Sequence, residues 1–129
     1  MIQIFEINHL FPTRSELTDI KFIECVKIAK IALVSERPMK MSRAMVEFIW
    51  KEQRPLSDRE LDEIFSGGQK ILLNAIREAG ILKCVSKESI IGIKHNWSLS
   101  PRNFGVKIIM DDFKGISYLK NSIIPMKSY

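Results

Sequence analysis

A chain of 129 residues, 46% hydrophobic and 27% charged, has the length and composition of one globular domain, which excludes an intrinsically disordered protein. Its formal charge of +5 favours an acidic partner, of which nucleic acid is the commonest, although a basic surface that only faces solvent has the same charge. Two cysteines are too few for a disulfide framework, and no apolar run reaches the roughly 20 residues of a membrane span, so we expect a cytoplasmic protein that is not bound to a membrane.

The first third of the chain predicts a short strand and a long helix. The segment IQIFEI alternates loosely between apolar and polar residues, which is typical of a strand. From Ser15 to Val34 the apolar residues recur at helical spacing, and charged residues fall largely between them. Thr13 or Ser15 can cap the start of this helix, and Pro38 closes the segment.

The segment MSRAMVEFIWKEQ predicts a second helix. Ser42 suits the N-cap position, and Met45, Phe48 and Ile49 form one apolar face at helical spacing. Pro55 ends this helix or directly follows it, because the residue before a proline is disfavoured in helical conformation.

Two helix start signals follow, nine residues apart. Ser57 and Ser66 are each followed three residues later by a glutamate or a glutamine, which is the spacing of a capping box. Gly67 and Gly68 suit a tight turn, because glycine easily adopts the backbone angles that turns need. We therefore expect a short helix, a sharp turn and a longer helix that ends at Gly80.

After Gly80 the apolar period changes from helical to alternating. The segments ILKCV and IIGIKHNWSLS predict the two strands of a hairpin with its tip from Ser86 to Ser89. Pro101 ends the hairpin. Helical spacing of apolar residues then predicts a C-terminal helix over about 104–120.

This order of elements between Met41 and Ser100 resembles the winged helix-turn-helix superfamily, in particular its small prokaryotic or viral regulators. The segments that carry the resemblance are MSRAMVEFIWKEQ, LSDRELDEIF, SGGQKILLNAIREAGIL and LKCVSKESIIGIKHNWSLS. The resemblance implies a single-domain, mainly helical α+β fold. It would have a winged helix-turn-helix core over about 41–100, a two-stranded hairpin wing, and extra helices over about 15–35 and 104–120.

In DNA-binding members the longer helix enters the major groove and the wing touches the adjacent backbone. The resemblance therefore implies DNA contacts at the start of that helix, along one stripe of it, and at basic residues of the wing and just after it. These nine residues are Ser66, Gln69, Lys70, Asn74, Arg77, Lys83, Lys87, Lys94 and Arg102. A stripe of lysine, asparagine and arginine is equally what any solvated helix face shows.

These features predict a sequence-specific binding protein for double-stranded DNA, a small transcriptional regulator with no enzymatic activity, metal or cofactor. The alternative is a winged-helix module that binds another protein, as an adaptor, inhibitor or assembly subunit, which the apolar Ile71 on the expected outer face favours. Surplus apolar surface on the helices over 15–35 and 104–120 predicts a homodimer, unless both helices complete the core of a monomer.

Overall fold

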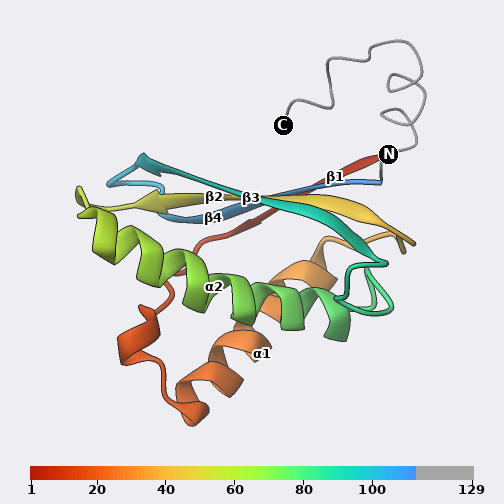
Figure 1. Cartoon of the computed structure of the whole chain (residues 1–129), viewed down its shortest axis with the longest axis horizontal. Coiled ribbons are helices and arrows are strands. Elements are labelled where there is room, and N and C mark those ends of the chain that lie inside the picture. Colours follow the sequence, from red (N-terminus) through yellow and green to blue (C-terminus); the bar gives the residue numbers. More distant parts are fainter. Residues whose placement is uncertain (113–129) are drawn as a thin grey trace.

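The computed structural model describes residues 1–112 and shows a four-stranded mixed sheet with two helices packed on one face (Figure 1). The elements are β1 (Ile2–Ile7), a 3-10 turn η1 (Arg14–Glu16), α1 (Asp19–Ser35), β2 (Ala44–Glu52), α2 (Asp58–Glu78), β3 (Ile90–Leu99) and β4 (Gly105–Asp111). The strands lie in the order β1-β4-β2-β3. Strand β4 is antiparallel to both of its neighbours, whereas β2 and β3 run parallel.

This architecture contradicts the winged helix-turn-helix resemblance and the mainly helical fold class. The segment expected to be the first helix of the motif is the central strand β2. Alternate residues from Ala44 to Trp50 are buried against the helices, which is the period of a strand. The helical prediction followed Met45, Phe48 and Ile49; it was wrong because β2 carries apolar residues on both faces.

Helix α2 is continuous where the sequence predicted a turn at Gly67 and Gly68. Its ends are where they were predicted: Ser57 accepts a hydrogen bond from the backbone N–H of Glu60 in a capping box, and Gly80 follows the last turn. Only one of the two capping signals therefore starts a helix. The second lies in the middle of α2.

The two glycines inside α2 are buried and permit close packing. A Cβ on Gly68 would overlap the indole of Trp50, with the Cζ2 and Cζ3 atoms only 2.8 Å away. A Cβ on Gly67 would lie 3.2–3.3 Å from backbone atoms of Arg14 in η1. Glycine lowers helix propensity by about 1 kcal/mol relative to alanine. Here it lets the helix lie directly on β2 and η1.

The predicted hairpin wing is absent from the described residues, because β3 is the parallel neighbour of β2 and α2 is the crossover between them. Residues 81–85 contribute only a single bridge between Met41 and Leu82. The start of the expected C-terminal helix forms β4 instead, and residues 113–120 lie outside the described residues.

The strand and helix expected in the first third of the chain are confirmed as β1 and α1. The expected start of the helix was wrong, because Thr18 is its N-cap and the predicted caps, Thr13 and Ser15, lie at η1. The core fills the space between the sheet and the two helices. Its largest fully buried side chains come from α1, β2, α2 and β4 and from Ile81 and Leu82, which follow α2. Among residues 1–112, no helix is long and apolar enough to cross a membrane.

Candidate anion-binding groove

Helix α2 ends in a Schellman motif that fixes the path of the chain at one end of the sheet. The N–H of Gly80 donates to the carbonyl of Arg77 at 3.0 Å, and the N–H of Ile81 donates to the carbonyl of Ile76 at 3.2 Å. Gly80 has a φ of 77°, which glycine adopts without steric penalty. Ile76 and Ile81 are both buried in the core, so the turn is held by apolar packing as well.

Immediately after this turn, the chain pairs with the segment that leads into β2. The N–H of Met41 donates to the carbonyl of Ile81 at 2.7 Å, and Met41 and Leu82 form a parallel bridge. The bridge brings the residues that flank it, Lys40 and Lys83, to the last turn of α2.

Three cations surround an open groove at this point, which we call the basic groove: Lys40, Arg77 and Lys83. The groove has a volume of about 470 Å³. Its remaining lining residues are Met41, Gly80, Ile81 and Leu82. All three cations are exposed, and within residues 1–112 no carboxylate forms an ion pair with any of them. A groove with this lining attracts anions.

The basic groove lies at the end of the sheet where the α1–β2 and α2–β3 connections meet (Figure 1). We call this region, residues 36–43 and 77–88, the loop end. It holds six basic residues and three acidic ones, so its charge has the same sign as that of the groove. The basic residues are Arg37, Lys40, Arg43, Arg77, Lys83 and Lys87.

The structure brings only some of the nine predicted DNA-binding residues together. Arg77 and Lys83 line the basic groove, and Lys87 is exposed in the same loop. Lys94 lies on the face of the sheet opposite the helices, and Arg102 lies in the turn after β3, at the far end of that strand. These five residues therefore occupy at least three separate surfaces.

The other four predicted residues contact the chain itself. The Ser66 hydroxyl donates to a backbone carbonyl of α2 at 3.3 Å, and Gln69 contacts the partly buried His95. The Lys70 ammonium lies 5.4 Å from the ring centroid of Phe22 on α1. Asn74 donates to the Lys70 carbonyl at 2.8 Å and accepts from Arg77 at 2.9 Å. Asn74 therefore positions the guanidinium of Arg77 at the basic groove.

Sequence reasoning missed Lys40, the third cation of the groove. Arg37 and Arg43 lie three residues to either side of this lysine, but nothing in the local sequence shows that it faces Arg77 and Lys83. Its place depends on the pairing of Met41 with Leu82, two residues that are far apart in the chain.

The histidine beside Gln69 belongs to a partly buried polar cluster. Trp50 Nε1–H donates to His95 Nδ1 at 2.9 Å, and His95 Nε2 lies 2.7 Å from Gln69 Oε1. Because Nδ1 accepts, the proton lies on Nε2 and is donated to Gln69. The imidazole stacks on Phe65 with ring centroids 4.8 Å apart, and burial lowers the pKa of His95. Both ring nitrogens are engaged, so the neutral imidazole ties α2 to β2 and β3.

Within the described residues, no group of three or more histidine, cysteine, aspartate or glutamate side chains is placed to hold a metal ion. The basic groove is thus the feature of residues 1–112 with the clearest chemical preference.

Comparisons with known proteins do not identify a family. No family model matches the chain, and no curated protein matches it. A chain in the crystal structure of the HypE–HypF complex is similar over 84% of this chain and 30% of that chain, with 18% identity and a TM-score of 0.36. The present chain thus spans less than a third of that chain's length, and a similarity this weak carries no argument about function.

Proposed function

We propose that the chain binds double-stranded DNA through its phosphates, at the loop end, with the basic groove as the centre of the contact. The proposal rests on one observation: Lys40, Arg77 and Lys83 come from separate segments and converge on one open groove without an acidic lining residue. Lysine and arginine supply most phosphate contacts in nucleic-acid complexes, and neutralised phosphates release counterions.

This mode of DNA binding differs from that of a recognition helix, which lies in the major groove. The first half of α2 is net acidic, because its exposed or partly exposed charges are Asp58, Glu60, Asp62 and Glu63 against Arg59 alone. In the second half Lys70 and Arg77 outnumber Glu78. Phosphates along a major groove would repel the acidic half. We therefore propose that DNA contacts the C-terminal end of α2 and the two loops, and that α2 does not lie lengthwise in a groove.

Contacts of this kind give affinity without information about base sequence. We thus expect binding that falls steeply as salt rises and depends little on sequence. A role as a cytoplasmic transcriptional regulator without enzymatic activity stays a prediction from the sequence.

The alternative function, a module that binds another protein, loses one of its two reasons. Ile71 was expected on an outer face, but its side chain is 0% exposed and faces the sheet. The other reason, surplus apolar surface on α1, remains, because the outer side of α1 is exposed in the structure.

The proposal is tested by anisotropy titrations of a labelled duplex at a series of salt concentrations. We expect log affinity to fall linearly with log salt, and each lost phosphate contact to lower the slope by about 0.9. The variant Lys40→Glu/Lys83→Glu should bind at least about tenfold more weakly than the wild type at low salt.

Arg102→Glu is the matched control for the single variant Lys83→Glu, because each replaces one exposed cation by a carboxylate and Arg102 lies at the far end of β3. It should bind nearly as well as the wild type. If Arg102→Glu weakens binding as much as Lys83→Glu does, the attraction is general and the groove is not the site. Undetectable binding of the wild type at low salt would refute the proposal, and equal binding of single strands would refute its duplex part.

A further inference from the structure

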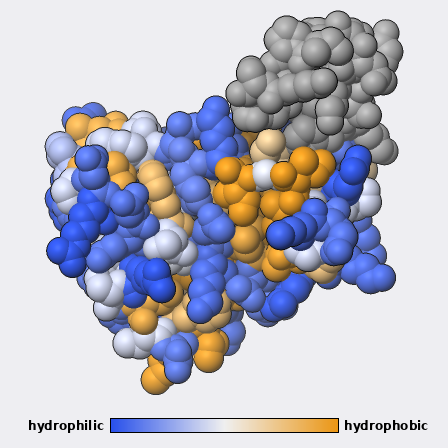
Figure 2. All heavy atoms as spheres, in the orientation of Figure 1, coloured by the Kyte–Doolittle hydropathy of each residue, from blue (hydrophilic) through white to orange (hydrophobic). Residues whose placement is uncertain are grey.

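Helix α1 is apolar on two opposite sides. Its inner side packs on the sheet and α2 through the buried residues Cys25, Val26, Ala29 and Leu33. Its outer side carries four large apolar residues, Ile20, Ile23, Ile31 and Val34, which are 70%, 63%, 64% and 48% exposed. Hydrophobic side chains are visible at the lower end of the molecule, where α1 begins (Figure 2). A helix that is apolar all round is normally buried all round.

These four residues and Lys27 form one line along the helix, which we call the outer stripe. Successive members are three, four, four and three residues apart, so they share one helix face. This spacing is the same in both directions, with Lys27 at its centre. An antiparallel second copy would therefore place Ile20 opposite Val34 and Ile23 opposite Ile31.

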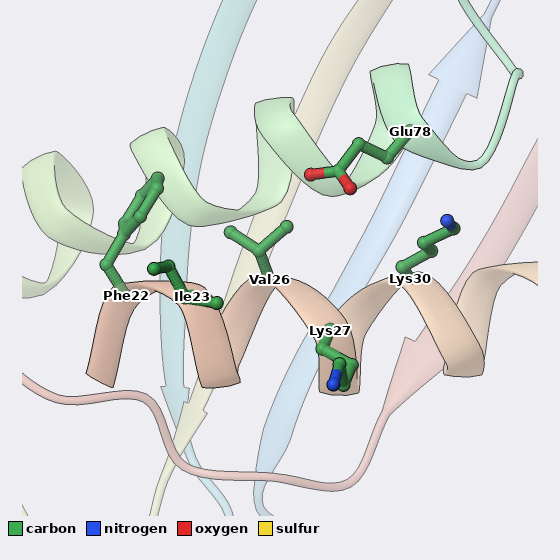
Figure 3. A pocket seen from close by; sticks show the side chains of 6 residues that line it. All are labelled: Phe22, Ile23, Val26, Lys27, Lys30 and Glu78. Carbon is green, nitrogen blue, oxygen red and sulfur yellow. The ribbon is translucent and has the colours of Figure 1, made fainter. Parts of the chain in front are cut away.

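A hollow lies beside the outer stripe, between α1 and α2, with a volume of about 200 Å³. Phe22, Ile23 and Val26 give it an apolar floor, and Figure 3 shows Glu78 reaching from α2 towards α1 above them. Two helices pack when a ridge of side chains on one fits into a groove on the other, and this surface has both a ridge and a hollow.

We propose that the outer stripe is the interface of a homodimer in which α1 packs antiparallel on α1 of a second copy, with the two-fold axis at Lys27. The two Lys27 side chains would face each other at the axis, and the Glu24 carboxylates would offset this like-charge pair. Glu24 is exposed one turn before Lys27, so each lysine in the dimer has its own Glu24 on one side and the partner's on the other. A different protein partner would not require a stripe that is symmetric about its centre. This inference is independent of DNA binding.

The interface is small, and its size sets the expected affinity. One pair of 17-residue helices, each about 26 Å long, buries less than the roughly 800 Å² per partner of a standard interface. We expect a dissociation constant in the micromolar range, so the monomer and the dimer should interconvert with concentration.

Sedimentation velocity of the full chain over a range of concentrations tests the interface. Ile23→Glu/Ile31→Glu should weaken association at least about tenfold, and circular dichroism should show an intact fold because both sites are exposed. Lys27→Leu should tighten association, since it makes the stripe continuously apolar and removes two like charges from the axis. A purely structural role of α1 predicts no such gain.

Ile91→Glu is the matched control. Ile91 is 43% exposed on β3, which is an edge strand of the sheet and not part of α1. This variant should associate like the wild type. A wild type that stays monomeric up to several hundred micromolar would overturn the proposal. So would dissociation by Ile91→Glu and not by the stripe variant.

Cross-linking tests the register. In a Cys84→Ser background, Lys27→Cys should form a disulfide-linked dimer when copper phenanthroline and dioxygen oxidise the two thiols. Ile20→Cys alone should not, because its two copies would lie about 21 Å apart, whereas a mixture of Ile20→Cys and Val34→Cys should. Efficient self-linking of Ile20→Cys would show a parallel pair and overturn the antiparallel register.

Discussion

Helices α1 and α2 lie side by side on the same face of one sheet, yet their outer sides differ. The inner side of α2 is fully buried, and its outer side is charged, so this helix is amphipathic in the usual sense. The inner side of α1 is also buried, but its outer side carries the apolar outer stripe. Within the described residues, the large apolar side chains of α2 are buried or partly buried, whereas those on the outer side of α1 are exposed.

Because their outer sides differ, the two helices should contribute differently to the stability of the monomer and to its association with a second copy. Side chains of α2 that face the sheet should hold the monomer together. Side chains of the outer stripe should contribute little to the folding of a monomer, since they are as exposed in the folded chain as in many unfolded conformations. Substitutions of the same chemistry on the two helices should therefore have different effects.

The largest effect is expected for the pair Ile71→Ala and Ile31→Ala. Ile71 is 0% exposed, so truncation leaves a cavity and should lower the free energy of unfolding by about 2–5 kcal/mol. Ile31 is 64% exposed, so its truncation should change that free energy by no more than about 0.5 kcal/mol. Urea unfolding at a concentration where the chain is monomeric measures both. Equal losses would mean that the outer stripe is covered within the chain itself, and the dimer would lose its basis.

The next largest effect is expected for Gly68→Ala, which should lower the free energy of unfolding by about 1–3 kcal/mol. Its new Cβ would overlap the indole of Trp50, which is held between β2 and the helices. Gly67→Ala is the control, because it makes the same gain in helix propensity but meets only the backbone of η1 at 3.2–3.3 Å. We expect it to lie near the wild type in urea unfolding. If Gly68→Ala is as stable as Gly67→Ala, then α2 does not rest on Trp50 as described.

A smaller, pH-dependent effect is expected at His95. Burial lowers its pKa in the folded chain, so the unfolded chain binds a proton more readily. Stability from the neutral imidazole is fully present above the unfolded value of about 6.5 and is lost as the pH falls below it. Protonation also removes the acceptor of the Trp50 indole N–H. Unfolding curves between about pH 8 and pH 5 should show this loss in the wild type.

His95→Phe should remove that part of the pH dependence. It should also lower stability at about pH 8 by roughly 1–3 kcal/mol, because Trp50 and Gln69 lose their partner. His9→Phe should keep the pH dependence of the wild type. The same pH dependence in His95→Phe would show that another group causes it.

The elements that could be predicted from sequence are those with local signals. The strand at 2–7, the long helix near 15–34, the start of α2 at Ser57 and its end at Gly80 all follow from spacing and caps within a few residues. Gly67 and Gly68 were misinterpreted because the reason for them, the indole of Trp50, lies on another element. Nothing within the helix shows that its middle must lie so close to a strand.

The pairing of the strands could not be predicted from the local sequence for the same reason. Strands β2 and β3 are parallel neighbours separated by the whole of α2, and β4 inserts between β1 and β2. The basic groove contains residues that the local sequence identifies and one that it does not. Arg77 and Lys83 were named from local charge, whereas Lys40 joins them only through the pairing of Met41 with Leu82.

The smallest effect concerns the two thiols, one on the inner side of α1 and the other in the connection that follows α2. Cys25 is buried on the inner side of α1, and burial raises the pKa of its thiol. Cys84 follows Lys83 at the loop end, and hydrogen bonds with the hydroxyls of Ser86 and Ser89, the latter at 3.0 Å, lower the pKa of its thiol. An alkylating reagent followed by mass spectrometry should therefore modify Cys84 well before Cys25.

Duplex DNA connects this reactivity to the basic groove. If phosphates occupy the groove, a bound duplex should slow the modification of Cys84, because the thiol is adjacent to Lys83, and should leave the rate at Cys25 unchanged. Ser89→Ala should slow Cys84 several-fold without any DNA, since it removes one hydrogen bond to the thiolate. Rapid modification of Cys25 would mean that the inner side of α1 opens, and the division between a structural inner side and an associating outer side would not hold.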